Sequence, residues 1–365
     1  MNYRLATLLE REVHASDITK IIDITLADKV SQIQIIHEPY NSASGAQTAH
    51  PAACISKIEL IDGSDVIFSL TGKEAQAADY YHRGKASASF ANYLPTLYAK
   101  QIFNINFGRF LFDPLLAFDP TKFRNPQLKI TIDVDGGGST VTTGYLSVLA
   151  NLFDEKAINP VGFLMHKEIK DYALASAAHE YTDLPVDFAY RKLFIRMQKY
   201  GTGPSDAFDT VKLSEDNDKR VPFNHTISQI LAALAGTYAP YQENVLHEGS
   251  ATAYYVYVCP TQDVNMQGTQ WRATASHAFI GYLYADGGRA TFDQYDETSN
   301  TQLLATGYCP HGVIELPFGD PGNLEDWYDV SKVKNLRLDI KTASGMASTD
   351  SCQIFMQQFR KYAAA

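Results

Sequence analysis

The chain has 365 residues, of which 45% are hydrophobic, 12% aromatic and only 20% charged, with a formal net charge of −10 at pH 7. The hydrophobic content excludes a disordered chain, the length predicts two domains, and the acidic balance excludes a protein that neutralises a nucleic-acid backbone over its whole surface. The 22 Tyr, 19 Phe, 23 Gly and 15 Pro residues favour many short strands separated by turns.

The first predicted element is a helix over residues 3–14, because Leu5, Leu8, Leu9 and Val13 fall near helical spacing. Residues 1–16 are therefore assigned to an N-terminal helix or arm. We expect this helix either to pack on its own domain or to act as an assembly arm that reaches a neighbouring subunit or a membrane surface. The candidate contact residues of the arm are Tyr3, Leu5, Leu8, Leu9 and Val13.

From residue 17 onward the sequence is typical of strands. A hairpin is predicted over residues 57–70 with its turn at Asp62-Gly63, and a short helix over residues 74–82 follows it. Residues 156–166 are the best linker candidate, because Asn159-Pro160 and Gly162 interrupt the pattern. A second strand-rich run follows the linker, and one helix at residues 226–238 interrupts this run after a hairpin.

A twelve-residue segment occurs twice without gaps, at 119–130 and 329–340. The preceding hairpins align as well, with Ile58 and Leu60 on Val211 and Leu213, and with Phe68 and Leu70 on Val221 and Phe223. Two matching windows in the same order predict an internal duplication, with extra residues in the middle of the second copy. The identical positions of the repeated segment are Asp119, Lys122, Asn125, Leu128 and Ile130 in the first copy, and Asp329, Lys332, Asn335, Leu338 and Ile340 in the second.

Each copy contains about eight short strands and one helix after a hairpin, which is typical of a jelly roll. Helical periodicity is too scarce for a fold in which strands and helices alternate. We therefore predict an all-β chain of two tandem jelly-roll β-sandwiches, with a short N-terminal helix and one helix inserted in each roll. The predicted domains are a first jelly roll over residues 17–160 and a second over residues 161–365 that carries longer loop insertions.

This arrangement resembles the double jelly-roll major capsid proteins of tailless icosahedral viruses, many of which contain a membrane. The resemblance covers nearly the whole chain and is carried by the segments KIELIDGSDVIFSLTGKEAQAADYY, NFGRFLFDPLLAFDPTKFRNPQLKITID and LPFGDPGNLEDWYDVSKVKNLRLDI. It implies a non-enzymatic protein that trimerises into pseudo-hexagonal capsomers and builds an icosahedral shell, with a bacteriophage as the expected source.

The resemblance also implies partners and a location. The expected partners are further copies of the chain in a homotrimer, neighbouring capsomers, other virion proteins such as penton or spike proteins, and an internal membrane. The expected location is the capsid shell of the virion, after synthesis in the host cytoplasm. Direct nucleic-acid binding is not expected, since neither half of the chain is basic.

No residues have the spacing of a catalytic, cofactor-binding or metal site. The ten histidines include no HxH, HxxxH or HExxH pattern, and the four cysteines include no CxxC pair. The alternative function is a double jelly-roll carbohydrate-active enzyme or glycan-binding protein that resembles glycan amidases. Its candidate residues are a carboxylate beside an aromatic ring, Asp326 and Trp327.

Overall fold

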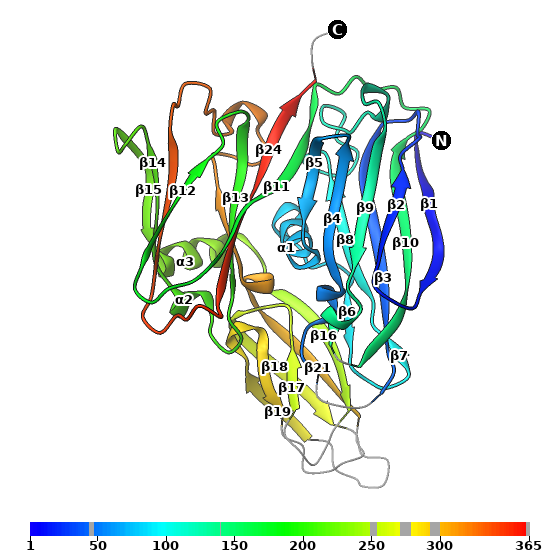
Figure 1. Ribbon diagram of the computed structural model, residues 1–365, viewed down its shortest axis with the longest axis vertical. Helices are drawn as coiled ribbons and strands as arrows, with labels where there is room; N and C mark the ends of the chain where they lie inside the picture. The colour runs from blue at the N-terminus through cyan, green and yellow to red at the C-terminus, as the bar shows by residue number, and fades with distance from the viewer. Residues whose placement is uncertain (44–46, 139, 249–253, 271–278, 293–299, 363–365) are drawn as a thin grey trace.

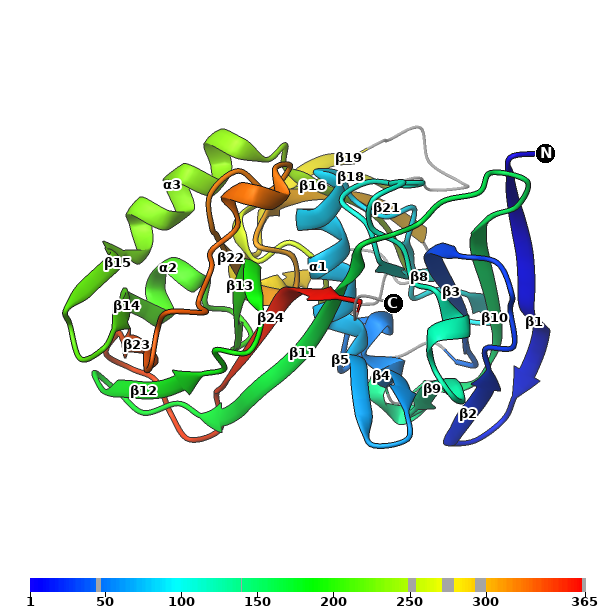
Figure 2. The ribbon, with the colours of Figure 1, turned by 90° about the horizontal axis from the view of Figure 1, so that it is seen from above.

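The computed structural model describes residues 1–43, 47–138, 140–248, 254–270, 279–292 and 300–362 (Figure 1). Within these residues the chain forms two β-sandwiches that lie side by side, and a smaller group of strands lies beyond them at one end (Figure 1). The chain begins, and its last strand ends, at the opposite end of the molecule (Figure 1). The view from above shows the two sandwiches as separate curved layers that meet near α1 (Figure 2).

The first sandwich has one sheet in which β1, β10, β3 and β8 are neighbours, with the short β7 also on β3, and a second sheet in the order β2-β9-β4-β5. Its apolar side chains alternate along β9 and β10, so that one face of each sheet fills the interior. The strands are β1 (Tyr3–His14), β2 (Ile18–Asp23), β3 (Val30–Asn41), β4 (Ile55–Asp62), β5 (Asp65–Leu70), β7 (Leu97–Tyr98), β8 (Gln101–Asn106), β9 (Pro126–Ile132) and β10 (Val141–Phe153).

The second sandwich repeats this strand order. Its sheets run β11-β24-β13-β22 and β12-β23-β14-β15, so that in both sandwiches the eight main strands are arranged 1-8-3-6 and 2-7-4-5 in chain order. This is the arrangement of a jelly roll, and the predicted pair of jelly rolls is confirmed. The strands are β11 (Gly162–Ala173), β12 (His179–Leu184), β13 (Ala189–Gln198), β14 (Phe208–Glu215), β15 (Arg220–Thr226), β22 (Val313–Pro317), β23 (Leu336–Thr342) and β24 (Ser351–Lys361).

One longer helix follows the fifth strand of each roll, as predicted. α1 (Gly72–Arg83) follows β5, and α3 (Ile227–Thr237) follows β15. Both helices begin with the same capping box, in which a Thr side chain and the side chain three residues later satisfy each other's backbone N–H groups: Thr71 with Glu74, and Thr226 with Gln229. The remaining helical turns are short: α2 (Pro204–Ala207), η1 (Pro51–Cys54), η2 (Pro120–Lys122), η3 (Asp135–Gly137), η4 (Asp286–Gly288), η5 (Pro310–Gly312) and η6 (Leu324–Asp326).

Replacing either capping threonine by alanine is expected to lower the free energy of unfolding by about 1 kcal/mol, because one backbone donor of the first helical turn loses its acceptor. Urea unfolding of Thr71→Ala and Thr226→Ala measures this loss. The matched controls are Thr71→Ser and Thr226→Ser, which keep the hydroxyl group. Serine variants as unstable as the alanine variants would contradict the capping role.

The predicted N-terminal helix is wrong, because residues 3–14 form strand β1, the first strand of the first roll. β1 pairs antiparallel with the thirteen-residue β10, whose edge would otherwise present a long row of unpaired backbone groups. The register shifts twice, between Thr7 and Leu9 and between Leu9 and Glu12. These bulges change the face on which successive side chains lie, and the leucine spacing then imitates a helix.

The extra residues of the second roll form a folded body of their own, where long loops were expected. Residues 238–335 connect α3 to β23, whereas residues 84–125 connect α1 to β9. Much of the longer connection forms a sheet in the order β19-β18-β21-β16-β6, together with the pair β17-β20, around a separate apolar core that includes Val245, Met266 and Leu303. The strands are β6 (Phe90–Asn92), β16 (Tyr241–Glu248), β17 (Tyr254–Tyr257), β18 (Gln262–Gln270), β19 (Phe279–Tyr284), β20 (Arg289–Phe292) and β21 (Asn300–Tyr308).

Two parallel strand pairs join the parts of the molecule. β5 of the first roll pairs with β11 of the second through Phe68 and His166, which makes one continuous eight-stranded sheet. β6, which comes from the first roll, pairs with β16 of the added body. The largest apolar core is likewise continuous and includes buried side chains of both rolls, such as Phe68 and Phe194. The two rolls are therefore packed as one unit.

Candidate assembly surfaces and the cavity between the rolls

The apolar residues of the repeated segment lie at equivalent positions in the two rolls. On β9, Leu128 and Ile130 lie opposite Leu60 and Ile58 of β4. On β23, Leu338 and Ile340 lie opposite Leu213 and Val211 of β14, and all eight side chains are buried. The recurrence of Leu and Ile in the sequence therefore reflects the same pairing of the same two strands.

The polar residues of the repeated segment build the same turn twice. A carboxylate oxygen of Asp119 accepts hydrogen bonds from the backbone N–H and hydroxyl of Thr121, and the Asp329 carboxylate accepts from the same groups of Ser331. Each copy is then tied to its neighbouring hairpin. The backbone N–H of Asn125 donates to Asp62, and that of Asn335 donates to Asp216.

Both lysines of the repeated segment, Lys122 and Lys332, are exposed, and the Lys122 ammonium group lies 4.9 Å from the centre of the Tyr362 ring. The described contacts of the repeated segment are thus contacts that form the fold. In the second copy, Asn335, Arg337 and Asp339 also line a polar surface hollow beside β14.

One part of the sequence alignment is wrong. Leu60 pairs with Phe68 in the first hairpin, and Leu213 pairs with Phe223 in the second, so Phe68 corresponds to Phe223 and not to Val221. The turn of the second hairpin, residues 216–219, is longer than the turn at residues 63–64 of the first. This longer turn shifts the returning strand by two residues.

The candidate arm residues divide between two faces of β1. Leu8 and Leu9 pack against the core, and Tyr3 stacks on Phe112 with ring centres 4.1 Å apart. Leu5 and Val13 point away from the core and are 58% and 60% exposed. Only these last two have most of their side-chain surface free to contact a partner.

A second exposed apolar surface, which we call the terminal patch, consists of Phe110, Leu111, Leu115 and Val161. Its loop lies beside the start of the chain, where Phe112 stacks on Tyr3, and beside the connection from β10 to β11, where the Val161 N–H donates to the Leu115 carbonyl. Its loop is held firmly from within: the buried Asp113 carboxylate pairs with the Arg109 guanidinium at 2.7 Å. This pairing lowers the pKa of Asp113 against the opposing effect of burial.

The residues of the glycan alternative are not placed for sugar binding. The Trp327 ring is only 4% exposed, and it packs on Phe359 with ring centres 5.7 Å apart. The Asp326 carboxylate accepts a hydrogen bond from the backbone N–H of Asp320 and so closes its own loop. A buried indole and a carboxylate used in a turn do not form the open aromatic platform that a sugar ring requires.

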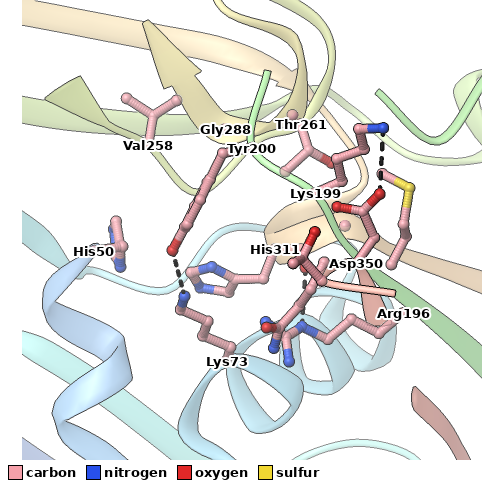
Figure 3. A pocket seen from close by; sticks show the side chains of 15 residues that line it. His50, Lys73, Arg196, Lys199, Tyr200, Val258, Thr261, Gly288, His311 and Asp350 are labelled. Carbon is pink, nitrogen blue, oxygen red and sulfur yellow. Dashed lines mark hydrogen bonds and ion pairs between the residues drawn. The ribbon is translucent and has the colours of Figure 1, made fainter. Parts of the chain in front are cut away.

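A cavity of about 180 Å³ lies where the first roll, the second roll and the added body meet (Figure 3). Lys73 of α1 projects into it between His50 and His311, and its ammonium group lies 3.4 Å from the Tyr200 hydroxyl (Figure 3). The Arg196 guanidinium of β13 also lines it. The pKa of Lys73 falls to about 7, because the surrounding protein removes it from water and Arg196 repels it.

This cavity could not be predicted from the sequence, since its lining comes from segments that are far apart along the chain. A usable sign was the buried strand AYRKLFIRMQ, in which Arg191, Lys192 and Arg196 interrupt an apolar run. Charged residues inside a central strand need partners in the interior. The described residues include no group of three or more His, Cys, Asp or Glu side chains placed to hold a metal ion. Among the same residues, no helix has the length and apolar character needed to cross a membrane.

The strand order of the two equivalent rolls, and the pairing of the edge strands β5 and β11 that joins them, define the class of fold as a double jelly roll. Among solved structures, the chain is similar to the STIV MCP of Sulfolobus Turreted Icosahedral Virus, with a TM-score of 0.60 and 11% identity over 97% of this chain and 96% of that chain. It is similar to the major capsid protein P2 from Bacteriophage PM2, with a TM-score of 0.55 and 10% identity over the whole of both chains.

A third similar structure is PBCV-1 VP54, fitted into a cryo-EM reconstruction of the virophage Sputnik, with a TM-score of 0.58 and 12% identity over 98% of this chain and 94% of that chain. No protein-family model matches the sequence, and no curated protein matches it significantly. At identities this low, what the chain shares with these proteins is the fold, and the fold is that of the double jelly-roll major capsid proteins.

Proposed function

We propose that the chain is a viral major capsid protein that forms homotrimers and builds an icosahedral shell in the virion. The observation that carries the proposal is the presence of two jelly rolls of identical strand order in one chain, similar over nearly its whole length to solved capsid proteins. Three such chains in a closed ring present six equivalent rolls, which suits a pseudo-hexagonal capsomer that tiles a shell with one gene product.

The exposed apolar surfaces suggest where partners bind. Leu5 and Val13 lie on the free edge strand β1, a position from which a neighbouring subunit can be contacted. The terminal patch lies at the end of the molecule opposite the added body, and we propose that it faces an internal membrane or another virion protein such as a penton or spike protein. The net charge of −10 favours a shell protein that encloses its genome without binding it.

We propose that the first roll extends from β1 to residue 160 and that the second roll begins at residue 161. The proposal is that of a structural protein without catalytic activity. The glycan alternative has less support, because Trp327 is buried.

Size-exclusion chromatography with light scattering, followed by negative-stain imaging, tests the proposal. The expected result is a particle of about three times the chain mass of 40.5 kDa with a hexagonal outline, or complete shells. Leu5→Ser with Val13→Ser is expected to weaken association, whereas Thr7→Ser, at another exposed position on the same strand, serves as the control. A protein that stays monomeric at high concentration and forms no particles would overturn the proposal.

A further inference from the structure

We infer that the cavity between the two rolls and the added body is a binding site for a small inorganic oxyanion of the phosphate or sulfate class. The inference concerns a ligand of the folded chain and does not depend on the proposed function.

The Lys73 ammonium group has no ion-pair partner among the described residues. The described contacts of the Lys73 ammonium group are the Tyr200 hydroxyl at 3.4 Å and the Tyr200 ring, and no carboxylate of the described residues forms an ion pair with it. The nearby Arg196 is equally without a carboxylate in hydrogen-bond range: its guanidinium donates to the His311 carbonyl and to the Gln353 amide oxygen. Two cations that line one cavity in this way repel each other unless an anion lies between them.

The acidic groups around the cavity are already engaged. The Asp350 carboxylate lies 3.2 Å from the Lys199 ammonium group, and the Glu243 carboxylate lies 2.8 Å from His50. Glu74, whose charge is the largest favourable influence on Arg196, is buried and closes the capping box of α1 with Thr71. None of these carboxylates forms an ion pair with Lys73 or Arg196 among the described residues.

Two imidazole rings, those of His50 and His311, line the cavity. The His50 Nδ1 atom accepts a hydrogen bond from the backbone N–H of Ala52, and its Nε2 atom faces Glu243. The His311 Nε2 atom faces the Gln76 amide oxygen, and burial holds the pKa of His311 well below its ordinary value. The Lys73 ammonium group and the Tyr200 hydroxyl converge beside these rings, as Figure 3 shows, and both can donate to a ligand in the cavity.

The volume of the cavity and its access from solvent suit a small ion. A cavity needs only about 10–15 Å³ to hold one water molecule, so 180 Å³ accommodates a tetrahedral anion and some of its water, but not a nucleotide. Tyr200 is 42% exposed and lies at the mouth, which leaves a path from solvent. One oxyanion can accept from Lys73 and Tyr200 together, since charge-assisted hydrogen bonds of this type are the strong ones.

Thermal unfolding and titration calorimetry with inorganic phosphate test the site, at a pH just below neutral and at constant ionic strength maintained with sodium chloride. The expected result is a saturable rise in the unfolding temperature with phosphate that chloride does not produce, because a ligand that binds only the folded state stabilises it. Sulfate in a parallel titration shows whether the site accepts both oxyanions.

Lys73→Gln is expected to weaken phosphate binding by at least about tenfold, which corresponds to the loss of one charge-assisted contact of about 1.4 kcal/mol or more. Lys85→Gln, just beyond the same helix and exposed, is the matched control and should bind as the unchanged protein does. Tyr200→Phe, which removes only a hydroxyl group, should weaken phosphate binding severalfold. This variant tests the site if Lys73→Gln does not fold. Equal effects of phosphate and chloride, or full binding by both variants, would overturn the inference.

Discussion

Lowering the pH from 6 to 5 is expected to reduce the free energy of unfolding by about 4 kcal/mol, well before most carboxylates take up protons. The cause is a set of buried neutral histidines. Burial lowers the pKa of His37 and of His166 to about 3, and it holds the pKa values of His82 and His311 well below 6.5. All four rings bind protons in the unfolded chain at pH 6 but remain neutral in the folded chain.

The direction follows from counting protons. Between the lowered folded pKa and the unfolded value of 6.5, the unfolded state holds more protons, so stability increases with pH and is lost as the pH falls. Each such histidine contributes about 1.4 kcal/mol per pH unit. Glu74 acts in the opposite direction, because burial, assisted by the charge of Glu168, raises its pKa to about 7 and the folded state therefore binds its proton first. Four histidines less one glutamate leave a net difference of about three protons.

The surroundings of these rings explain why they resist protonation. His37 is fully buried, and its Nε2 atom lies 2.9 Å from Nε2 of His14, so a proton on one ring is repelled by a proton on the other. The Nδ1 atom of His82 lies 3.0 Å from the Arg191 guanidinium. A proton on His82 would be repelled by the Arg191 guanidinium, and this repulsion adds to the cost of burying a charged ring.

Urea unfolding at pH 7, 6 and 5 measures the effect, and the slope of the unfolding free energy against pH gives the number of protons. His166→Gln is expected to lower that number by about one. The control is His225→Gln, because His225 is exposed on β15 and its replacement should leave the slope unchanged. An unfolding free energy that stays constant from pH 7 to pH 5 would show that the rings are not buried as described.

The second large effect is expected from Glu315→Gln, which should lower the free energy of unfolding by about 3–5 kcal/mol. Glu315 of β22 and Lys192 of β13 form an ion pair 3.1 Å apart, with 0% and 2% of their side chains exposed. The Lys192 ammonium group also donates to the Tyr81 carbonyl and the Tyr238 hydroxyl. Removing the carboxylate leaves a buried cation whose remaining partners are neutral.

The double variant Lys192→Met with Glu315→Leu is the decisive comparison. Replacing a buried ion pair by apolar side chains of similar volume is often neutral, so the double variant should recover much of the stability that the single variant loses. Denaturant unfolding of the single and double variants measures both values. A loss below about 1 kcal/mol for Glu315→Gln would mean that the pair is hydrated in the protein.

The sequence predicted the pair of rolls because the repeated residues have local structural roles in each roll. The aspartate that caps the turn and the Leu and Ile of the following strand recur at equivalent places, so they recur in the sequence. The hairpin alignment failed at the returning strand. The second turn contains Asp216, Asn217 and Asp218 with positive φ angles, and no spacing in the sequence reveals how many residues such a turn takes.

The N-terminal strand and the cavity could not be predicted for a different reason. Whether residues 3–14 form a helix or a strand depends on the free edge of β10, which is supplied by residues more than a hundred positions later. The cavity likewise depends on the approach of α1 to β13, which brings Lys73 near Arg196. Both features arise from tertiary contacts that local propensity does not contain.

The strand pair between β5 and β11 has a mechanical consequence. The pairing of His166 and Lys167 with Phe68 and Ser69 opposes a hinge motion between the rolls, and the pairing of β6 with β16 ties the added body to the first roll in the same way. The molecule is therefore expected to behave as a stiff tile. Any closed surface built from it must take its curvature from changes in the contacts between tiles, since bending within one tile would break a continuous sheet.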